Sequence, residues 1–157
     1  MDDEVREFAV AVLNRLMKDS SVTGMRFFTP QLLLDGPNDV NQEAFINLTS
    51  NWHVFDQHPG MFPDNLDEVA EEEAELQMHR LRGEEVEKVE IATPWPHLVV
   101  TFKSGKILYL NGHDENFEPW TAGMTKFGNG GDDWLVVACP GGALAVWAPE
   151  NWDCGSQ

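Results

Sequence analysis

The pattern of hydrophobic and polar positions predicts five short strands in the second half of the chain. Apolar runs of roughly four to eight residues, bounded by turn signals such as Ser104-Gly105 and Asn111-Gly112, are typical of strands. The predicted strands cover residues 86–91, 97–102, 106–110, 134–139 and 143–147. Because strands joined by short turns pair antiparallel, we expect an antiparallel β-meander over residues 86–147.

These predicted strands are apolar on both faces. Leu98, Val100 and Phe102 point to one face of their strand, and Val99 points to the other. A sheet with one face in water would instead alternate apolar and polar residues. The first half of the chain, or a partner, must therefore cover both faces.

An amphipathic helix is predicted over residues 3–18. Six apolar residues recur there at helical spacing: Val5, Phe8, Ala9, Val12, Leu13 and Leu16. Asp2, Asp3 and Glu4 lie where the helix dipole favours negative charge. We assign this helix to one face of the sheet.

Strand signals also occur before the midpoint of the chain. Residues 44–55 alternate apolar and polar side chains and predict one strand, with Ser50 marking a bulge or a bend. Residues 25–28 predict a short strand, and residues 31–35 fit either a strand or a helical turn.

A second helix is predicted over residues 65–81, with Asp64 or Asn65 as its cap and Gly83 after its end. Its apolar stripe is thin and its other faces are acidic. The acids of the helix and of the segment after it are Asp67, Glu68, Glu71, Glu72, Glu73, Glu75, Glu84 and Glu85. Two interpretations stay open: a solvated helix face, or an acidic surface that binds a partner.

The formal net charge of −17 over 157 residues argues against direct binding of nucleic acid or anionic membrane, because phosphates would be repelled. It favours a basic protein partner or simply high solubility. The length predicts a single α+β domain over residues 1–157. The acidic N-terminus and the lack of a long apolar segment predict a cytoplasmic protein. No cofactor motif is present.

The stretch from residue 112 to residue 133 is predicted as a long loop, and long loops in compact domains are often functional. It contains an alternative site formed by His113, Asp114, Glu115 and Trp120. Its second part, residues 128–133, is rich in glycine but lacks the Lys-Ser/Thr of a phosphate-binding loop. A short tail, residues 148–157, follows the last strand.

Other candidate chemistry has a simpler explanation. His53, Asp56 and His58 do not match the spacing of a known closed metal site, either alone or with residues 113–115, so no metal is predicted. Cys139 lies in an apolar strand and is predicted to be structural, and the two cysteines make no disulfide framework. The tryptophans suggest either a ligand platform or core packing: Trp95, Trp120, Trp147 and Trp152 for the platform, and Trp52, Trp134 and Trp147 for the core.

In size, acidity, α+β layout and lack of catalytic motifs, the chain resembles small acidic bacterial immunity proteins. That resemblance implies a non-catalytic protein that neutralises a basic, nuclease-like toxin. We expect the acids of residues 67–75 and 84–90 to form the contact surface. Two alternatives stay open: an enzyme or ligand-binding protein with its site in the loop 112–133, and a homo-oligomeric structural module.

Overall fold

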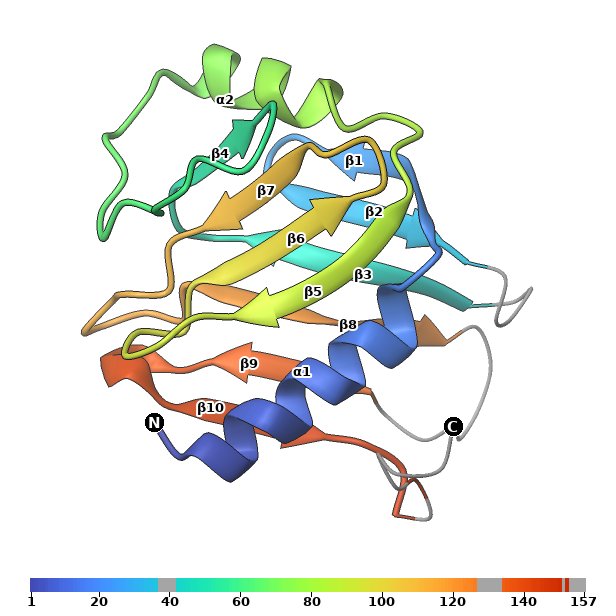
Figure 1. Ribbon diagram of the computed structural model, residues 1–157, viewed down its shortest axis with the longest axis vertical. Helices are drawn as coiled ribbons and strands as arrows, with labels where there is room; N and C mark the ends of the chain where they lie inside the picture. The colour runs from blue at the N-terminus through green and yellow to red at the C-terminus, as the bar shows by residue number, and fades with distance from the viewer. Residues whose placement is uncertain (37–41, 127–133, 151, 153–157) are drawn as a thin grey trace.

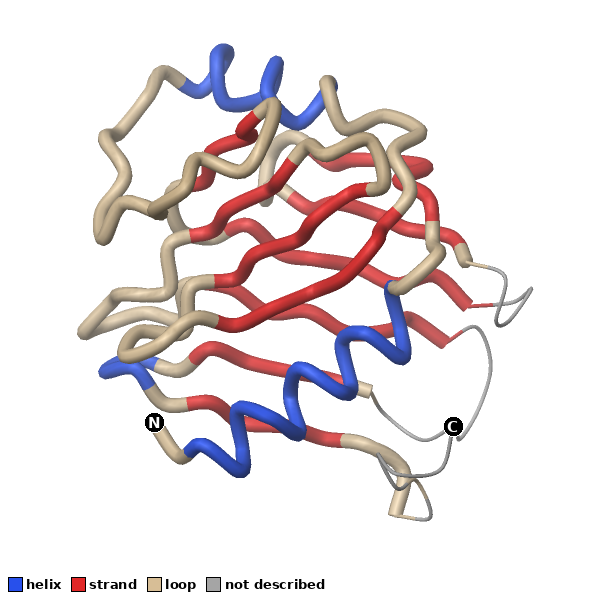
Figure 2. Tube along the Cα trace, viewed as in Figure 1, coloured by secondary structure: helices blue, strands red, loops and turns tan. Residues whose placement is uncertain are grey.

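Two antiparallel sheets and two helices make up the described part of the chain, which a computed structural model gives for residues 1–36, 42–126, 134–150 and 152 (Figures 1 and 2). The helices are α1 (Asp3–Met17) and α2 (Glu71–His79). The strands are β1 (Ser21–Arg26), β2 (Gln31–Asp35), β3 (Gln42–Leu48), β4 (Trp52–Phe55), β5 (Val86–Ile91), β6 (Leu98–Phe102), β7 (Ile107–Leu110), β8 (Trp120–Lys126), β9 (Leu135–Ala138) and β10 (Leu144–Trp147). The predicted α+β class of a single domain is confirmed.

The strands form a six-stranded sheet A, with the order β1-β2-β3-β8-β9-β10, and a four-stranded sheet B, with the order β4-β7-β6-β5. The five strands predicted in the second half are confirmed to within one residue at either end. Antiparallel meanders are present there as well, because β5, β6 and β7 are consecutive neighbours and so are β8, β9 and β10. The first of these meanders lies in sheet B and the second in sheet A, so the strands do not form one continuous sheet.

The single strand predicted over residues 44–55 is wrong, because the chain changes sheets within it. β3 ends in sheet A at Leu48, and β4 begins in sheet B at Trp52. The Ser50 amide donates to the Pro119 carbonyl at 2.8 Å, and the Asn51 carbonyl accepts from the Asn111 amide at 3.0 Å. These bonds hold the link against the segment that follows β7, and the interruption expected at Ser50 marks the crossing.

The predicted long loop contains β8, which pairs along its whole length with β3. Trp120 and Ala122 face the interior and are fully buried, whereas Thr121 and Gly123 face the opposite side of sheet A. The sequence of β8 gives only a weak strand signal, because many of its side chains are short and weakly apolar. The predicted first-half strand at residues 25–28 is likewise displaced, because β1 ends at Arg26 and the two following phenylalanines lie in the turn.

The main core lies between the inner face of sheet A, the inner face of sheet B and α1. Sheet B and α1 lie side by side on one face of sheet A (Figure 1). Residues such as Leu32, Ile46, Val100 and Leu108 are completely buried there. The predicted helix over residues 3–18 is confirmed, and Asp2 caps it by accepting from the Glu4 and Val5 amides at 2.8 and 3.4 Å.

The outer face of sheet B is covered by the segment that follows β4. Phe62 stacks on Tyr109 with ring centroids 5.0 Å apart, and the Tyr109 hydroxyl donates to the Pro63 carbonyl at 2.6 Å. Leu66 packs against the same cluster. This docking keeps the segment extended, so the helix predicted from residue 65 begins only at Glu71 and has no side-chain cap. The predicted caps Asp64 and Asn65 lie outside the helix.

On each edge strand of sheet B, an amide side chain from a helix forms hydrogen bonds with the backbone of one residue. Asn14 of α1 donates to the Val89 carbonyl at 2.8 Å and accepts from the Val89 amide at 2.9 Å, on the edge strand β5. Gln77 of α2 accepts from the Val54 amide at 2.9 Å, on the edge strand β4. Covering an edge removes a template for pairing with another chain.

Replacing Asn14 with leucine should lower the free energy of unfolding by about 1–3 kcal/mol. The substitution leaves two backbone groups of the buried residue Val89 without partners, and an unsatisfied buried polar group costs about this much. Chemical denaturation of the wild type and the variant measures the difference. An unchanged midpoint would show that the edge of β5 does not need these bonds.

Candidate functional site

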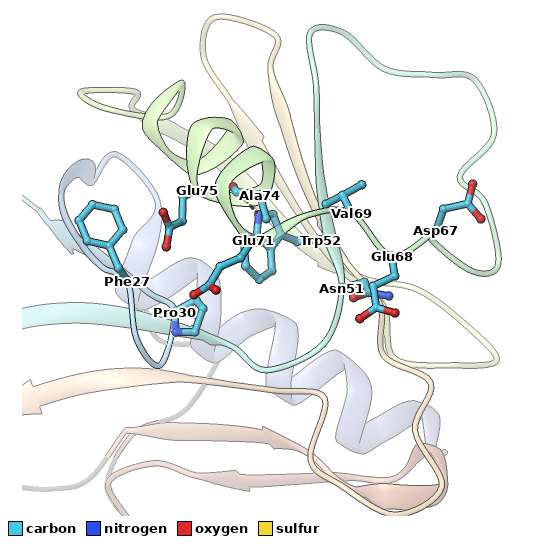
Figure 3. A pocket seen from close by; sticks show the side chains of 10 residues that line it. All are labelled: Phe27, Pro30, Asn51, Trp52, Asp67, Glu68, Val69, Glu71, Ala74 and Glu75. Atoms are coloured by element: carbon cyan, nitrogen blue, oxygen red, sulfur yellow. Dashed lines mark hydrogen bonds between the residues drawn. The ribbon is translucent and has the colours of Figure 1, made fainter.

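A hollow of about 220 Å³ lies where α2 passes over the start of β4 and the tip of the β1–β2 hairpin (Figure 3). Four acids and a group of mainly apolar residues line it. The lining residues are Phe27, Pro30, Asn51, Trp52, Asp67, Glu68, Val69, Glu71, Ala74 and Glu75. We call this feature the α2 hollow.

Trp52 and Gln77 hold α2 over the hollow. The Trp52 indole N–H donates to the Ala74 carbonyl at 3.3 Å. Gln77 accepts from the amide of Val54, two residues further along β4. Ala74 and Met78 bury the inner side of the helix. These contacts leave the side of α2 that carries Glu71 and Glu75 beside the hollow.

Two of the apolar residues that line the hollow, Phe27 and Val69, are exposed, and each has another exposed apolar residue nearby in the chain. Phe27 and Phe28 form the tip of the β1–β2 hairpin and are 49% and 89% exposed. Leu76, on α2, is 61% exposed, and Val69 lies exposed just before the helix. The turn that displays the phenylalanines holds Thr29 at φ 151°, a backbone conformation that favours glycine. Apolar patches of this kind mark interaction surfaces.

The acids of the hollow converge from the helix and from the segment before it. Figure 3 shows Glu71 and Glu75 projecting from α2 toward the side of the hollow formed by Phe27 and Pro30. They are one helical turn apart, a spacing at which like charges repel by a few tenths of a kcal/mol. The first-turn position of Glu71 partly offsets this, because the helix dipole favours a negative charge there.

The structure divides the eight acids of the predicted binding surface into two groups. Four line the hollow: Asp67, Glu68, Glu71 and Glu75. Glu72 and Glu73 are exposed on the first turn of α2. Within the part of the chain that the structure describes, no ion pair involves any of these six acids.

Glu84 and Glu85 have a structural role instead. Glu84 pairs with Lys106 at 3.0 Å, and Lys103 binds both Glu85 and Asp19, the latter at 2.9 Å. Burial tends to raise the pKa of Glu84, but hydrogen bonds from Ser104 and Lys106 outweigh it and lower that pKa. These two acids tie the start of β5 to its neighbours and are already neutralised, so they contribute little to an acidic binding surface.

The residues of the alternative loop site do not surround a common cavity. Trp120 is fully buried in β8, where its indole N–H donates to the Pro96 carbonyl at 2.8 Å. Asp114 closes a turn by accepting from the Asn116 and Phe117 amides, and these hydrogen bonds lower its pKa. His113 and Glu115 lie 3.5 Å apart at the surface. The chemistry of the loop is therefore mostly structural.

His97 and Trp95 organise the same end of the molecule. Trp95 stacks on His113 with ring centroids 3.7 Å apart, and His97 accepts from the Gly112 amide at 2.9 Å through Nδ1. Burial lowers the pKa of His97 from its usual value near 6.5; Asp64 opposes this change and His113 adds to it. His97 is thus a buried, neutral hydrogen-bond acceptor.

Other predicted side chains do not assemble into a site. Across the described ranges, no three His, Cys, Asp or Glu residues are placed to hold a metal ion. Burial raises the pKa of the free Cys139 thiol, which makes it a poor nucleophile. Trp147 is half-exposed on β10 rather than in the core, and Trp152 packs on Phe8 and Trp134. Residues 128–133, Cys154 and most of the predicted tail lie outside the described residues.

Sequence reasoning found the acids of the hollow but missed its apolar part. The sequence predicts Trp52 in a strand, which β4 confirms, but it does not indicate that Trp52 also lines the hollow. It predicts Phe27 and Phe28 in a strand, whereas they lie in a turn. The signal that was present is the order Phe-Phe-Thr-Pro, because a proline ends a strand and leaves the preceding aromatic residues in a turn.

Comparisons of the chain with protein family models, curated protein sequences and solved structures find no match. Neither α1 nor α2, nor any other helix among the described residues, is long and apolar enough to cross a membrane.

The neutral state of His97 should make stability depend on pH. The unfolded chain takes up a proton at this residue as the pH falls through about 6.5, whereas the folded chain takes it up only at lower pH. The stabilisation is therefore complete above pH 6.5 and declines below it, by at most about 1.4 kcal/mol per pH unit for one proton.

A His97→Asn variant, which keeps an acceptor near the Gly112 amide but does not titrate, should lack this component. The unfolding free energies of wild type and variant, measured by denaturation from pH 7.5 to about pH 5, should converge as the pH falls. Parallel curves would contradict the assignment of a buried neutral imidazole.

Proposed function

We propose that this chain is a non-catalytic protein-binding module whose α2 hollow receives a basic protein partner. The observation that carries the proposal is the combination at one place of six acids with no ion pair among the described residues and a cluster of exposed apolar side chains. Exposed acids that form no ion pair are available to a cationic partner. The tolerated repulsion between Glu71 and Glu75 is consistent with a role that outweighs its cost.

The apolar residues define the kind of partner. A purely acidic face would attract any cation, but protein interfaces place aromatic and aliphatic residues at their centre and polar residues at the rim. Phe27 and Val69, which are exposed and line the hollow, offer such a centre beside Glu71 and Glu75. We infer a folded basic partner that inserts a long side chain, such as arginine, among these residues, where an aromatic ring and a carboxylate both favour a guanidinium.

Neutralisation of a nuclease-like toxin is the biological role that we propose for this binding. It is supported by the likeness in size and acidity to immunity proteins, and by the overall charge of −17, which opposes direct contact with nucleic acid. A nuclease binds phosphate with a basic groove, so an acidic surface can block that groove. We place the interaction in the cytoplasm, an assignment supported by the free thiol of Cys139.

Affinity capture from the source lysate, performed at low and high salt and analysed by mass spectrometry, tests the proposal. We expect a basic protein to bind at low salt and to be lost as salt rises, because exposed charge pairs are screened. Recovery of an acidic or neutral partner with no dependence on salt would contradict a charge-driven interface.

The acids of the hollow should control the rate of association with the captured partner. A Glu71→Gln/Glu75→Gln variant should bind about threefold to tenfold more slowly with the dissociation rate less affected, since charge complementarity acts mainly on encounter. The rates are measured by surface plasmon resonance with the purified partner. Fold stability should be unchanged or slightly higher, because the like-charge repulsion on α2 is removed.

A matched control is Glu7→Gln/Glu118→Gln, which removes the same amount of charge from exposed acids that do not line the hollow. α1, which carries Glu7, begins at the end of the molecule opposite α2 (Figure 1). This control should associate almost as fast as the wild type. Equal effects of the two variants would show that net charge, rather than the α2 hollow, governs binding.

A further inference from the structure

The outer face of sheet A carries an apolar row that crosses all six strands. Residues directly opposite each other in neighbouring strands share a face. The registers place six residues in one line from the edge β1 to the edge β10: Gly24, Leu33, Phe45, Gly123, Leu135 and Trp147. Their neighbours along each strand, such as Leu32 and Ile46, point into the core and are fully buried.

At Gly24 and Gly123 the row has no side chain, so the neighbouring leucines can lie over the backbone there. A Cβ atom at Gly123 would lie 2.4 Å from the Trp134 carbonyl oxygen and 3.1 Å from the Leu135 side chain. A Cβ atom at Gly24 would lie 3.2 Å from the side chain of Leu33. The large side chains therefore occupy the space above the glycines, and a glycine inside a strand often marks a close approach by another group.

No helix or strand of the described residues covers this face. Sheet B and α1 lie together on the opposite side of sheet A (Figures 1 and 2). Trp147 remains 50% exposed, and Phe45, Leu135 and Trp147 line a surface hollow of about 240 Å³ together with Met124 and Trp134. The face has the form of one half of a sheet-on-sheet packing.

The two flanks of the apolar row differ in charge. On one flank, the acids Asp35 and Glu43 lie directly opposite each other. On the other flank, Arg26 lies beside a ladder in which Gln31 donates to Asn47 at 2.7 Å. Asn47 in turn donates to Thr121 at 2.7 Å. The face therefore has an acidic flank and a flank rich in hydrogen-bond donors.

We infer that this face is the interface of a homodimer in which two copies of sheet A pack face to face. A two-fold axis that runs along the apolar row, midway between the copies, stacks each large residue on its own counterpart. It also exchanges the flanks, so that Asp35 and Glu43 of one copy face Arg26 and Gln31 of the other. The geometry is that of two aligned sheets packed about 10 Å apart.

A second copy fits this face better than the basic partner proposed for the α2 hollow. The described side chains of the sheet A strands place only one base and two acids on it, Arg26, Asp35 and Glu43. A basic protein finds little charge to bind there. Two chains of net charge −17 repel each other least through a face that carries few of their charges. The inference does not rest on the proposed function.

Sedimentation equilibrium of the full chain, at protein concentrations up to about 1 mM, tests the dimer. The dimer fraction should rise between about 0.01 M and 1 M salt, because salt screens the net repulsion between the copies while apolar burial persists. This dependence has the opposite sign to that expected for the basic partner. A monomer at every salt and concentration, or a dimer that dissociates as salt rises, would overturn the inference.

Two substitutions test whether the dimer interface lies on the outer face of sheet A. Trp147→Glu should abolish the dimer, because the two-fold axis brings the introduced carboxylates together, whereas the control Phe28→Glu should leave it intact. Equal loss in both variants would contradict an interface on sheet A. Trp147→Glu should still bind the captured basic partner, so this test and that of the α2 hollow can fail separately.

A charge exchange tests the arrangement without touching the apolar row. Arg26 and Asp35 are both exposed, so substitutions there should not unfold the chain. Arg26→Glu and Asp35→Lys should each lower the dimer association constant by about threefold, and the double variant should restore it. Failure of the double variant to recover, with both single variants impaired, would rule out the proposed two-fold axis.

Discussion

The hydrogen bond from the Val54 amide to Gln77 fixes the relation between α2 and sheet B, and the rest of the site depends on it. An edge strand exposes backbone groups that must be paired or covered. Gln77 of α2 supplies a partner for this edge, and Trp52 adds a second bond to the carbonyl of Ala74. With α2 held there, Glu71 and Glu75 lie beside the tip of the β1–β2 hairpin.

The acids of the molecule are unevenly paired and unevenly distributed, so its two candidate interfaces differ in charge. Lysines neutralise Glu84 and Glu85, while the acids around the α2 hollow have no ion pair among the described residues. Among the described side chains, the outer face of sheet A carries few charges and an apolar row between its flanks. One surface therefore suits a partner of opposite charge, and the other suits a copy of the same chain. Salt should act on the two in opposite directions.

Local patterns predicted the strongly apolar elements but missed β8, and tertiary contacts decided the limits of others. The apolar stripe of α1 and the runs that form β5, β6 and β7 are strong signals, and each appears within one residue of its expected bounds. The helix expected from residue 65 failed because Phe62 docks on Tyr109 and keeps the chain extended as far as Ala70. No spacing in the sequence reveals that contact. The acids of the site were visible in the sequence because they follow one another within residues 67–75. Its apolar wall was not visible, because Phe27 joins the hollow only through the fold.

Hydrogen–deuterium exchange of the chain, alone and with its captured partner, locates the binding surface. We expect slower exchange on binding at the hairpin tip, residues 27–30, and across residues 67–76, which include the first turns of α2. Amides of the 112–119 segment and of β10 should exchange as in the free protein. Protection confined to the 112–119 segment, with the hairpin tip and α2 unchanged, would contradict the α2 hollow as the binding site.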